Sequence, residues 1–386
     1  MAVKADQKLR RTLIRANREV RSGRPPFPTD VNVAVHKFPT WIGSPRRPVE
    51  MTQFWFRTRG CTFDRAGQCS MCNYGIGDEI DIDEVGTSVE RILSRVRKGS
   101  FIYLSPSGSL LDDREVPAAL RERLLACVAK REPTRFVFET RPETCTPERL
   151  DRVKEMLPDT TTLVCQLGLE SWDPDVRSLC HLKPATQEPY VTVLGRLRER
   201  HYESIANLTL GGLGLSTREA YEDTLTSVRG AREAGFTTKI VFPLSAKSGT
   251  LLGWAHDRGL WNPVPLWVLV LLLAAAAQDR PGPDGAGDLG VSWFNPQIDD
   301  VVKSRPDGCD VCRPHLVDVL NRFRQSPEQR VLDDGLDWRG CGCLAQAIEL
   351  LAADHHRRYP DRLAEIAERW EYERRDAGDR EPLPLL

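Results

Sequence analysis

The chain has 386 residues, of which 40% are hydrophobic and 28% are charged, and this composition excludes a disordered protein. Its length exceeds what one small core usually accommodates, so we expect a main domain with smaller attachments. The formal net charge is −1, which gives the molecule as a whole no electrostatic attraction for nucleic acid.

The first 24 residues form a basic arm with eight Lys or Arg residues and two acidic residues. Leu9, Leu13, Ala16 and Val20 share one face of a helix. We expect either a helix that docks on the domain with its charges in water, or a helix that contacts phosphate groups. Because the arm lacks the apolar stretch of a signal peptide, a cytoplasmic protein is expected.

The longest apolar run, residues 266–277, has twelve residues. This run is too short to cross a bilayer and predicts a buried helix, so no membrane association is expected. The chain also has eleven cysteines, and seven of them are clustered. In a cytoplasmic protein this number indicates metal or redox chemistry rather than disulfide bonds.

Strand and helix patterns alternate after a proline-rich lead-in. Six βα-type steps predict a parallel sheet with right-handed crossovers, and thus an α/β fold, a partial (β/α)6 TIM-like barrel. Functional side chains would then lie at the carboxyl ends of the strands. Strands are expected at 52–57, 101–104, 135–139, 162–168, 205–210 and 237–242, and helices at 87–97, 116–130, 147–157, 187–201 and 217–234.

We expect three domains along the chain. Residues 1–50 hold the arm and lead-in, 51–300 the barrel, and 301–386 a small cysteine-rich unit that ends in a helix over about 344–375. Residues 281–290 are rich in Pro and Gly and predict a loop within the barrel domain.

Cys61, Cys69 and Cys72 directly follow the first predicted strand. Three thiolates from one loop can hold three irons of a [4Fe–4S] cluster. The fourth iron then lacks a protein ligand, and the amine and carboxylate of S-adenosylmethionine (SAM) can occupy that open position. The alternative is a zinc knuckle, for which His36 is the nearby upstream histidine that could serve as the fourth ligand.

The stretch 57–75 with these cysteines resembles the radical SAM proteins grouped with the elongator catalytic subunit, and most closely the archaeosine-synthase type. Matching segments follow the second, third and fourth strands at 105–110, 138–143 and 168–171, and the resemblance covers about residues 50–345. It implies reductive cleavage of SAM at the cluster to a 5′-deoxyadenosyl radical. A reductant protein such as a flavodoxin or ferredoxin, a partner enzyme subunit and a tRNA substrate are further implied.

The resemblance also assigns SAM contacts. It places the SAM amino group at the turn of Ser107 and Gly108, where glycine permits close backbone approach. Glu139 and Glu170 end strands and can accept from an amine or from ribose hydroxyls, and Arg177 or Lys183 can pair with the SAM carboxylate. The turn lacks the acidic residue of the Gly-Gly-Glu common in radical SAM enzymes, and Glu139 is expected to take that role.

Four late cysteines form a second cluster: Cys309, Cys312, Cys341 and Cys343. Two closely spaced pairs make two half-sites of a tetrahedral four-cysteine site, which predicts structural zinc that staples the C-terminal unit. A second Fe–S cluster and free thiols are the alternatives, and His315 is near enough to replace one ligand. The resemblance includes a similar late cysteine pattern.

Three functions are compatible with these patterns. The first is a radical SAM enzyme that acts on a modified nucleoside in tRNA. The second is a radical SAM enzyme that acts on a small metabolite or natural-product precursor, with sulfur insertion if the second site is an Fe–S cluster. The third, a non-catalytic zinc-binding module, does not account for the six βα steps with polar residues at successive strand ends.

Overall fold

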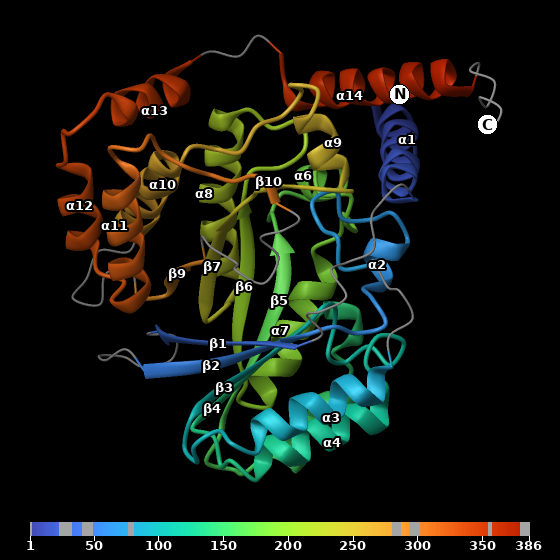
Figure 1. Ribbon diagram of the computed structural model, residues 1–386, viewed down its shortest axis with the longest axis vertical. Coiled ribbons are helices and arrows are strands. Elements are labelled where there is room, and N and C mark those ends of the chain that lie inside the picture. Colours follow the sequence, from blue (N-terminus) through green and yellow to red (C-terminus); the bar gives the residue numbers. More distant parts are fainter. Residues whose placement is uncertain are drawn as a thin grey trace, which may run out of the picture.

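The computed structural model describes residues 2–22, 33–40, 49–75, 81–279, 287–292, 302–353 and 357–378. A curled sheet of eight strands forms its centre (Figure 1), and the strands from β2 onward are all parallel, whereas the edge strand β1 runs antiparallel to β2. In spatial order the strands are β1 (Val33–Thr40), β2 (Val49–Phe56), β3 (Phe101–Pro106), β4 (Arg135–Thr140), β5 (Thr162–Glu170), β6 (Glu203–Leu210), β7 (Thr238–Pro243) and β9 (Leu289–Val291).

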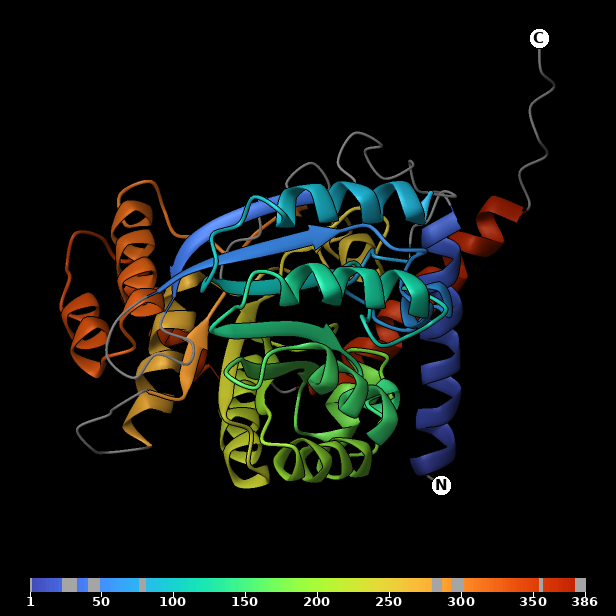
Figure 2. The same ribbon diagram turned by 90° about the horizontal axis from the view of Figure 1, so that it is seen from below.

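Helices cover the outer, convex face of the sheet (Figure 2). Their ends follow local signals: the Asp81 carboxylate caps the first of them, and Ser216 and Glu219 form a capping box on α8, which stops at Gly235 with φ 97°. These helices are α3 (Ile82–Leu93), α4 (Ala118–Ala129), α5 (Pro147–Met156), α7 (Glu188–Glu199), α8 (Thr217–Ala234) and α10 (Leu266–Gln278).

The structure confirms the predicted α/β half-barrel, because each of the six expected strands lies in the sheet and a helix follows each of the first five. Four of these helices lie within the expected ranges, whereas α3 begins five residues before its expected start. The predicted buried helix is α10, most of whose side chains are buried. Within the described residues, no helix combines the length and the apolar character needed to cross a bilayer.

Three expectations were wrong. The proline-rich lead-in was expected to contain no strand of the sheet, but eight of its residues form strand β1, which pairs with β2. The expected loop 281–290 ends in strand β9, which pairs with β7, while most of it lies outside the described residues. The single late helix is two helices, α13 (Cys343–Ala352) and α14 (Tyr359–Gly378).

The C-terminal unit packs beside the sheet (Figure 1). It contains α11 (Arg313–Gln325), α12 (Gln329–Leu336) and α13, which contact the buried helix α10. Helix α11 also contacts β1 and β9, the two edge strands of the sheet. The unit therefore spans the open side of the half-barrel.

The side chains that point into the half-barrel change character along each strand. Near the amino ends they are apolar and form one buried cluster: Met51, Phe101, Tyr103, Val137, Val164, Ile205 and Ile240. Side chains alternate between the two faces of a strand, so the next inward positions lie two residues further on. These positions are polar in five strands, as Gln53, Ser105, Glu139, Gln166 and Asn207 show. The carboxyl ends of the strands thus form a polar layer above an apolar floor.

Candidate active site

A cavity of about 470 Å³ lies inside the half-barrel. The apolar cluster forms its floor, and the polar strand ends, the cysteine loop and the C-terminal unit form its walls. The volume is that of a small-molecule or cofactor site in proteins. The expectation that the chemistry lies at the carboxyl ends of the strands matches the position of this cavity.

Glu139 is the centre of the polar layer. Its carboxylate accepts hydrogen bonds from the Tyr103 hydroxyl, from Ser105 Oγ at 3.3 Å and from Gln166 Nε2 at 3.2 Å, and Gln166 also donates to Asn207 Oδ1 at 2.9 Å. Burial raises the pKa of Glu139 to about 7. The network holds this carboxylate at the cavity wall in a fixed orientation.

Glu170 reaches the cavity through a break in the regular pairing of β5 with β6. The register shifts between Gly168 and Glu170, and Glu170 has a φ of 64°, which side-chain-bearing residues rarely adopt. The shift turns the Glu170 carboxylate into the cavity lining while Leu169 is buried in the main core. Lys183 Nζ lies 2.5 Å from Glu170 Oε1. Although burial alone would lower the pKa of Lys183, the Glu170 carboxylate raises it above its ordinary value.

The three early cysteines lie on the connection between β2 and α3. Cys61 precedes the short helix α2 (Thr62–Arg65), and Cys69 is buried with a φ of 73°. Cys69 and Cys72 share a hydrogen bond, which lowers the pKa of Cys72 and raises that of Cys69. Cys72 lines the cavity. The thiolate is the form that binds metals, and a lowered pKa favours it.

These cysteines do not have the geometry of a zinc knuckle. In a zinc site the ligand atoms crowd around one ion at about 2.0–2.3 Å. Among the described residues, the early cysteines and His36 form no group whose ligand atoms all lie within 4.8 Å of one another. A cubane cluster binds each thiolate on a different iron, so it does not require the three sulfur atoms to surround one ion.

A buried carboxylate joins the cysteine loop to the turn after β3. Glu115 Oε2 accepts from the backbone N–H of Ser109 at 2.6 Å, and Oε1 accepts from the backbone N–H of Thr62 at 2.6 Å. A Cβ on Gly108 would meet Glu115 Oε2 at 2.1 Å, so only glycine fits here. Neither Ser107 nor Gly108 is among the residues that line the cavity, and Ser107 Oγ accepts from the Thr58 backbone N–H at 2.9 Å.

Arg141, just after β4, neutralises this carboxylate. Its Nη1 lies 2.8 Å from Glu115 Oε1 and donates to Cys61 Sγ at 3.7 Å, while Nη2 reaches Asp112 Oδ2 at 2.5 Å. Burial alone would lower the pKa of Arg141, but Glu115 and the Cys61 thiol raise it above its ordinary value. A cation thus lies directly against one of the candidate cluster ligands.

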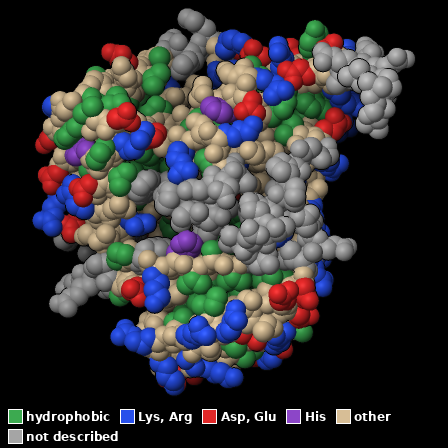
Figure 3. Space-filling view, viewed as in Figure 1, with side chains coloured by type: hydrophobic (Ala, Val, Ile, Leu, Met, Phe, Trp, Pro, Cys, Tyr) green, Lys and Arg blue, Asp and Glu red, His purple; other side chains and the backbone are tan. Residues whose placement is uncertain are grey.

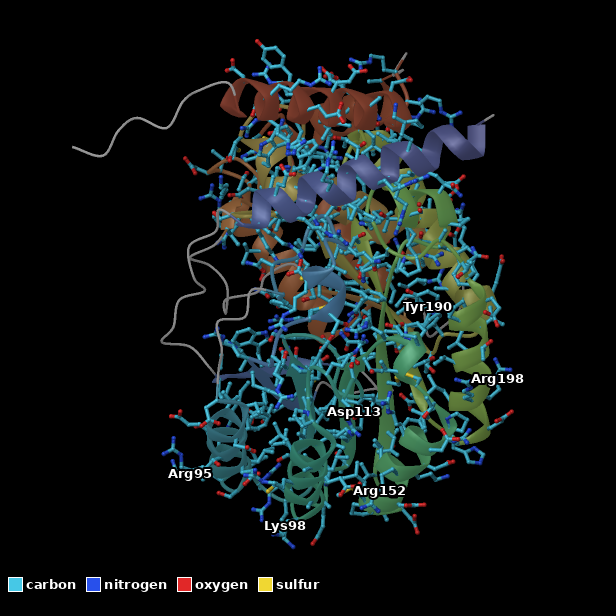
Figure 4. The ribbon with its side chains drawn as sticks, turned by 90° about the vertical axis from the view of Figure 1, so that its right-hand side faces the viewer. Arg95, Lys98, Asp113, Arg152, Tyr190 and Arg198 are labelled. Atoms are coloured by element: carbon cyan, nitrogen blue, oxygen red, sulfur yellow. The ribbon has the colours of Figure 1, made fainter. Side chains whose placement is uncertain are left out.

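Arg177 lies away from the cavity. It is fully buried, and its guanidinium donates to the backbone carbonyls of Ser171, Trp172 and Thr186 at 2.9–3.0 Å. It also lies 5.2 Å from the ring of Tyr190 on α7, which Figure 4 labels. These contacts hold the loop after β5, and we do not carry Arg177 into the proposed SAM site.

The basic arm is helix α1 (Ala2–Ser22), and it docks on the cysteine loop. Asn17 is fully buried, and its Nδ2 donates to the carbonyls of Gly67 at 2.9 Å and Cys69 at 3.3 Å. Its Oδ1 accepts from the backbone N–H of Leu251, which opens α9 (Leu251–His256), at 3.0 Å. Figure 4 shows α1 running across this side of the molecule, below α14.

Several cations of the arm point inward. Arg18 donates to the carbonyl of Ala66 at 2.8 Å, Arg21 pairs with the buried Asp64, and Arg10 donates to the carbonyls of Leu182 and Lys183 at 3.3 Å. The docked-helix expectation therefore holds for this face. The basic residues of the arm that remain exposed include Lys8 and Arg11.

The four late cysteines meet in one place. Their sulfur atoms all lie within 4.8 Å of one another, and Cys309 Sγ and Cys312 Sγ are 3.7 Å apart. His315 is not in this group: its Nε2 lies 2.9 Å from the Gly335 carbonyl oxygen, and its ring stacks on Trp338 at 5.0 Å. A metal ion can bind here, because four thiols at this spacing match the ligand set of a closed tetrahedral site.

Residues 55–226 match the family model of the radical SAM superfamily. This segment is a radical SAM domain, and the chain that contains it is a radical SAM enzyme. Enzymes of this superfamily use SAM and a [4Fe–4S] cluster, and the matched segment begins in β2 and includes the cysteine loop, Glu139, Glu170 and Lys183.

Two curated relatives have similar sequences. An uncharacterized protein of Methanocaldococcus jannaschii is 23% identical over 58% of this chain and 64% of its own length. The archaeosine synthase subunit beta of Methanosarcina acetivorans is 25% identical over 69% of this chain and 76% of its own length. The match thus spans less than two thirds of the first relative.

Solved structures align with this chain only at low TM-scores. The archaeal Elp3 of Methanocaldococcus infernus aligns with 15% identity and a TM-score of 0.45, covering 63% of this chain and 57% of that one. The radical SAM methyltransferase TsrM of Kitasatospora setae aligns with 12% identity and a TM-score of 0.44, covering 80% and 62%. Coproporphyrinogen III oxidase of Escherichia coli aligns with 14% identity and a TM-score of 0.36, covering 57% and 47%. Because these TM-scores are below 0.5, the assignment of the half-barrel fold rests on the strand order of the sheet and not on these alignments.

Sequence reasoning missed three residues that shape the radical SAM site: Glu115, Arg141 and Asn17. Arg141 stands inside a segment that carried the resemblance, two residues after Glu139, so its position after a strand was a usable signal. Glu115 belongs to an acidic run, and Asn17 lies on the apolar face of the arm. A lone amide among apolar helical positions was a signal for a buried hydrogen-bonded contact.

We predict that Asn17→Ala loosens the cysteine loop. The change leaves three buried backbone groups without their partner, so the free energy of unfolding should fall by about 1–3 kcal/mol. Urea denaturation measures this change, and iron retained after reconstitution should fall with it. Gln7→Ala, on the exposed side of the same helix, is the matched control. Full stability and full iron content in the Asn17 variant would contradict the role of α1.

We also predict strong coupling between Glu170 and Lys183. Glu170→Gln leaves the buried Lys183 cation without a counter-charge, and removal of one partner of a buried ion pair costs about 3–5 kcal/mol. The double variant E170Q/K183M should regain most of this loss, because it removes the charge as well. A double-mutant cycle by urea denaturation measures the coupling. A double variant no more stable than E170Q would show that the ion pair is unimportant.

Proposed function

We propose that this radical SAM enzyme acts on a modified nucleoside in tRNA. The observation that carries the proposal is the sequence likeness to archaeosine synthase subunit beta, which extends over 76% of that protein. The cavity supports it, because its polar lining residues and its volume suit one flipped-out base beside a cofactor. A reductant protein, a partner subunit and a cytoplasmic location belong to the same proposal.

In this proposal Cys61, Cys69 and Cys72 hold the [4Fe–4S] cluster. The fit rests on their common loop, their spacing and the Arg141 N–H that reaches Cys61 Sγ. When bound, the cluster supplies the electron that cleaves the sulfonium–carbon bond of SAM. Arg141 offsets negative charge on the thiolates, and hydrogen bonds to the sulfurs are among the factors that set a cluster's potential.

The SAM contacts in this proposal come from the strand ends. Glu139, held by Tyr103 and Gln166, accepts from the SAM amino group, and Glu170 accepts from the ribose hydroxyls. Lys183 positions Glu170 rather than binding the SAM carboxylate, because its ammonium group is already paired. The apolar floor keeps water away from the reacting atoms.

A second candidate is an enzyme that acts on a small metabolite. It is favoured by the net charge of −1 and by the engagement of Arg10, Arg18 and Arg21 within the protein, which removes them from contact with phosphates. Nucleic-acid binding would then depend on other cations. The two candidates differ in whether tRNA affects SAM cleavage.

We propose zinc as the metal at the late cysteines. Tetrahedral Zn–S bonds of about 2.3 Å place sulfur atoms roughly 3.8 Å apart, which matches the 3.7 Å between Cys309 and Cys312. A cubane cluster would spread the thiolates over four irons and so space them more widely. Cys312 begins α11, so the site fixes the start of that helix.

Incubation of the reduced enzyme with SAM and unfractionated tRNA tests the proposed substrate. We expect tRNA to stimulate formation of 5′-deoxyadenosine and to yield a nucleoside of altered mass after digestion. The variant K8Q/R11Q tests the exposed face of α1 without disturbing the cysteine loop, and weaker tRNA retention is expected if that face contacts phosphates. Unstimulated cleavage and an unchanged nucleoside profile would favour the metabolite candidate.

The cluster assignment predicts about four irons at the first site after anaerobic reconstitution. Cys69→Ala should lose this iron and all SAM cleavage, because one thiolate ligand is gone. Cys127→Ala, on α4 and outside the cavity lining, is the matched control and should keep both. Formation of 5′-deoxyadenosine by the Cys69 variant would show that the ligands were wrongly assigned.

The zinc assignment predicts about one zinc per chain in a variant with Cys61, Cys69 and Cys72 all changed to Ala, because a closed site of four thiolates binds one ion. Metal analysis by plasma mass spectrometry measures it. Adding Cys312→Ala should remove the zinc and lower the melting temperature, since metal binding contributes to folding. Iron with sulfide at this site would instead establish a second cluster.

A further inference from the structure

We propose that the carboxyl ends of α3 and α4, with the loops that follow them, form a surface that binds the phosphate backbone of the tRNA substrate. The inference rests on the proposed function for the identity of the RNA, and it adds the place where that RNA docks. Figure 3 shows Lys and Arg side chains gathered at the lower end of the molecule, over these two helices. The α3–α4 basic surface consists of Arg91, Arg95, Arg97, Lys98, Lys130 and Arg131.

Four of the six cations lie in one short stretch. Residues 91–98 contain four Lys or Arg residues and no acidic residue, and all four side chains are exposed. The dipole of a helix favours cations in its last turn, but α3 ends at Leu93. The dipole therefore explains Arg91 and leaves the three cations beyond the helix unexplained. Their mutual repulsion brings no benefit to the fold, as expected for a binding surface.

Hydrogen bonds between two loops make the surface continuous. Arg131 Nη1 donates to the Ser94 carbonyl at 2.9 Å, and the backbone N–H of Gly99 donates to the Arg131 carbonyl at 2.9 Å. Helices α3 and α4 also contact each other. The loop after α4 is thus fixed beside the loop after α3, so Lys130 lies on the same surface as the stretch 91–98.

The surface has more positive charge than neighbouring carboxylates neutralise. Within the described part of the chain, its ion pair joins Lys98 to Glu132, and both of these side chains are mostly exposed. Arg131 donates to backbone carbonyls, which leave its charge uncompensated. The side chains of the other four cations make neither an ion pair nor a hydrogen bond among the described residues. On α1, in contrast, several cations are already engaged within the fold.

The chemistry of the surface fits an RNA backbone better than a membrane or a protein. Of the large hydrophobic side chains that are exposed in the described part of the chain, none lies in 91–100 or 130–135. Surfaces that bind membranes include apolar side chains, and the centres of protein interfaces are enriched in aromatic ones. A surface of cations alone suits a polyanion, whose successive phosphates it neutralises with release of counterions.

The surface lies beside one edge of the cavity. Helix α3 contacts β1 and β2, as Figure 2 shows, and β1 contributes His36 and Thr40 to the cavity lining. Lys37, between these two residues, is exposed and adds a cation on the strand that separates α3 from the cavity. An RNA that lies across the surface and β1 can therefore place one flipped-out base in the cavity while its backbone remains on the surface.

Binding of fluorescently labelled, unfractionated tRNA to the reconstituted full chain tests the surface. Fluorescence anisotropy at several salt concentrations gives both the affinity and its salt dependence. The test variant is R91Q/R95Q/R97Q. Melting temperature and iron content establish that each variant is folded and loaded.

The matched control is R198Q/R330Q/R375Q, which removes three exposed cations from α7, α12 and α14. The control and the test variant have the same net charge, so a difference between them reports the position of the charges and not their total.

We expect the test variant to bind tRNA about tenfold more weakly than wild type. Its plot of log affinity against log salt concentration should be shallower by about two to three, because each lost phosphate contact removes about one released counterion. The control should remain within about twofold of wild type. SAM cleavage without tRNA should be unchanged in both variants, since no residue of the cysteine loop or the cavity is altered.

Equal affinity and equal salt dependence in the test and control variants would overturn the surface, while analysis of the tRNA nucleosides decides the proposed function by its own result. A tRNA that binds through this surface but keeps an unchanged nucleoside profile would refute the proposed function and leave the surface in place. Failure of the wild-type protein to bind tRNA would also overturn the surface, and retention of phosphatidylserine vesicles in that case would identify a membrane in place of RNA.

Discussion

A half-barrel of parallel strands leaves one side open, and the covering of that side is the constraint on which the rest of the structure depends. Two edge strands, β1 and β9, border the gap, and helix α11 contacts both. Unpaired edges and an apolar floor cannot remain exposed to water without cost. Cys309 and Cys312 precede α11 at one end, and Arg324 in the last turn of the helix lines the cavity. A metal at the late cysteines would thus contribute to the shape of a site on the far end of the same helix.

The cysteine loop faces a different constraint, because it contains little regular structure and must still be held rigidly. Buried ionic and polar groups hold the loop in place. Glu115 accepts hydrogen bonds from two backbone N–H groups of different loops, and Arg141 balances its charge. A buried ion pair of this kind is sensitive to loss of either partner. Asn17 adds a third connection from α1. The loop is therefore positioned by side chains from three distant segments of the chain, which explains why the arm belongs to the catalytic unit.

The sequence predicted those features that repeat along one strand or helix. The alternation of strand and helix patterns located the six parallel strands, and their carboxyl ends located Glu139 and Glu170. Contacts between distant segments were not predictable in this way. The pairing of Lys183 with Glu170 requires the shifted register of β5 and β6, and β1 was hidden because its strand pattern lies within proline-rich sequence. The contacts of Arg177 were not predictable for the same reason, because its three carbonyl acceptors converge only once the loop after β5 has folded.

The distribution of charge shows why net charge is a poor guide to the ligand of this protein. The arm carries the most evident basic pattern, yet Arg10, Arg18 and Arg21 contact backbone carbonyls or a buried carboxylate within the fold. The cavity obtains its cations from positions scattered between Lys37 and Arg324, where no local pattern marks them. Electrostatic attraction falls off within about 8–10 Å at physiological ionic strength, so an enclosed ligand responds to the cavity and not to the total of −1. After folding, the side chains that line the cavity, rather than the net charge of the chain, decide which ligand it binds.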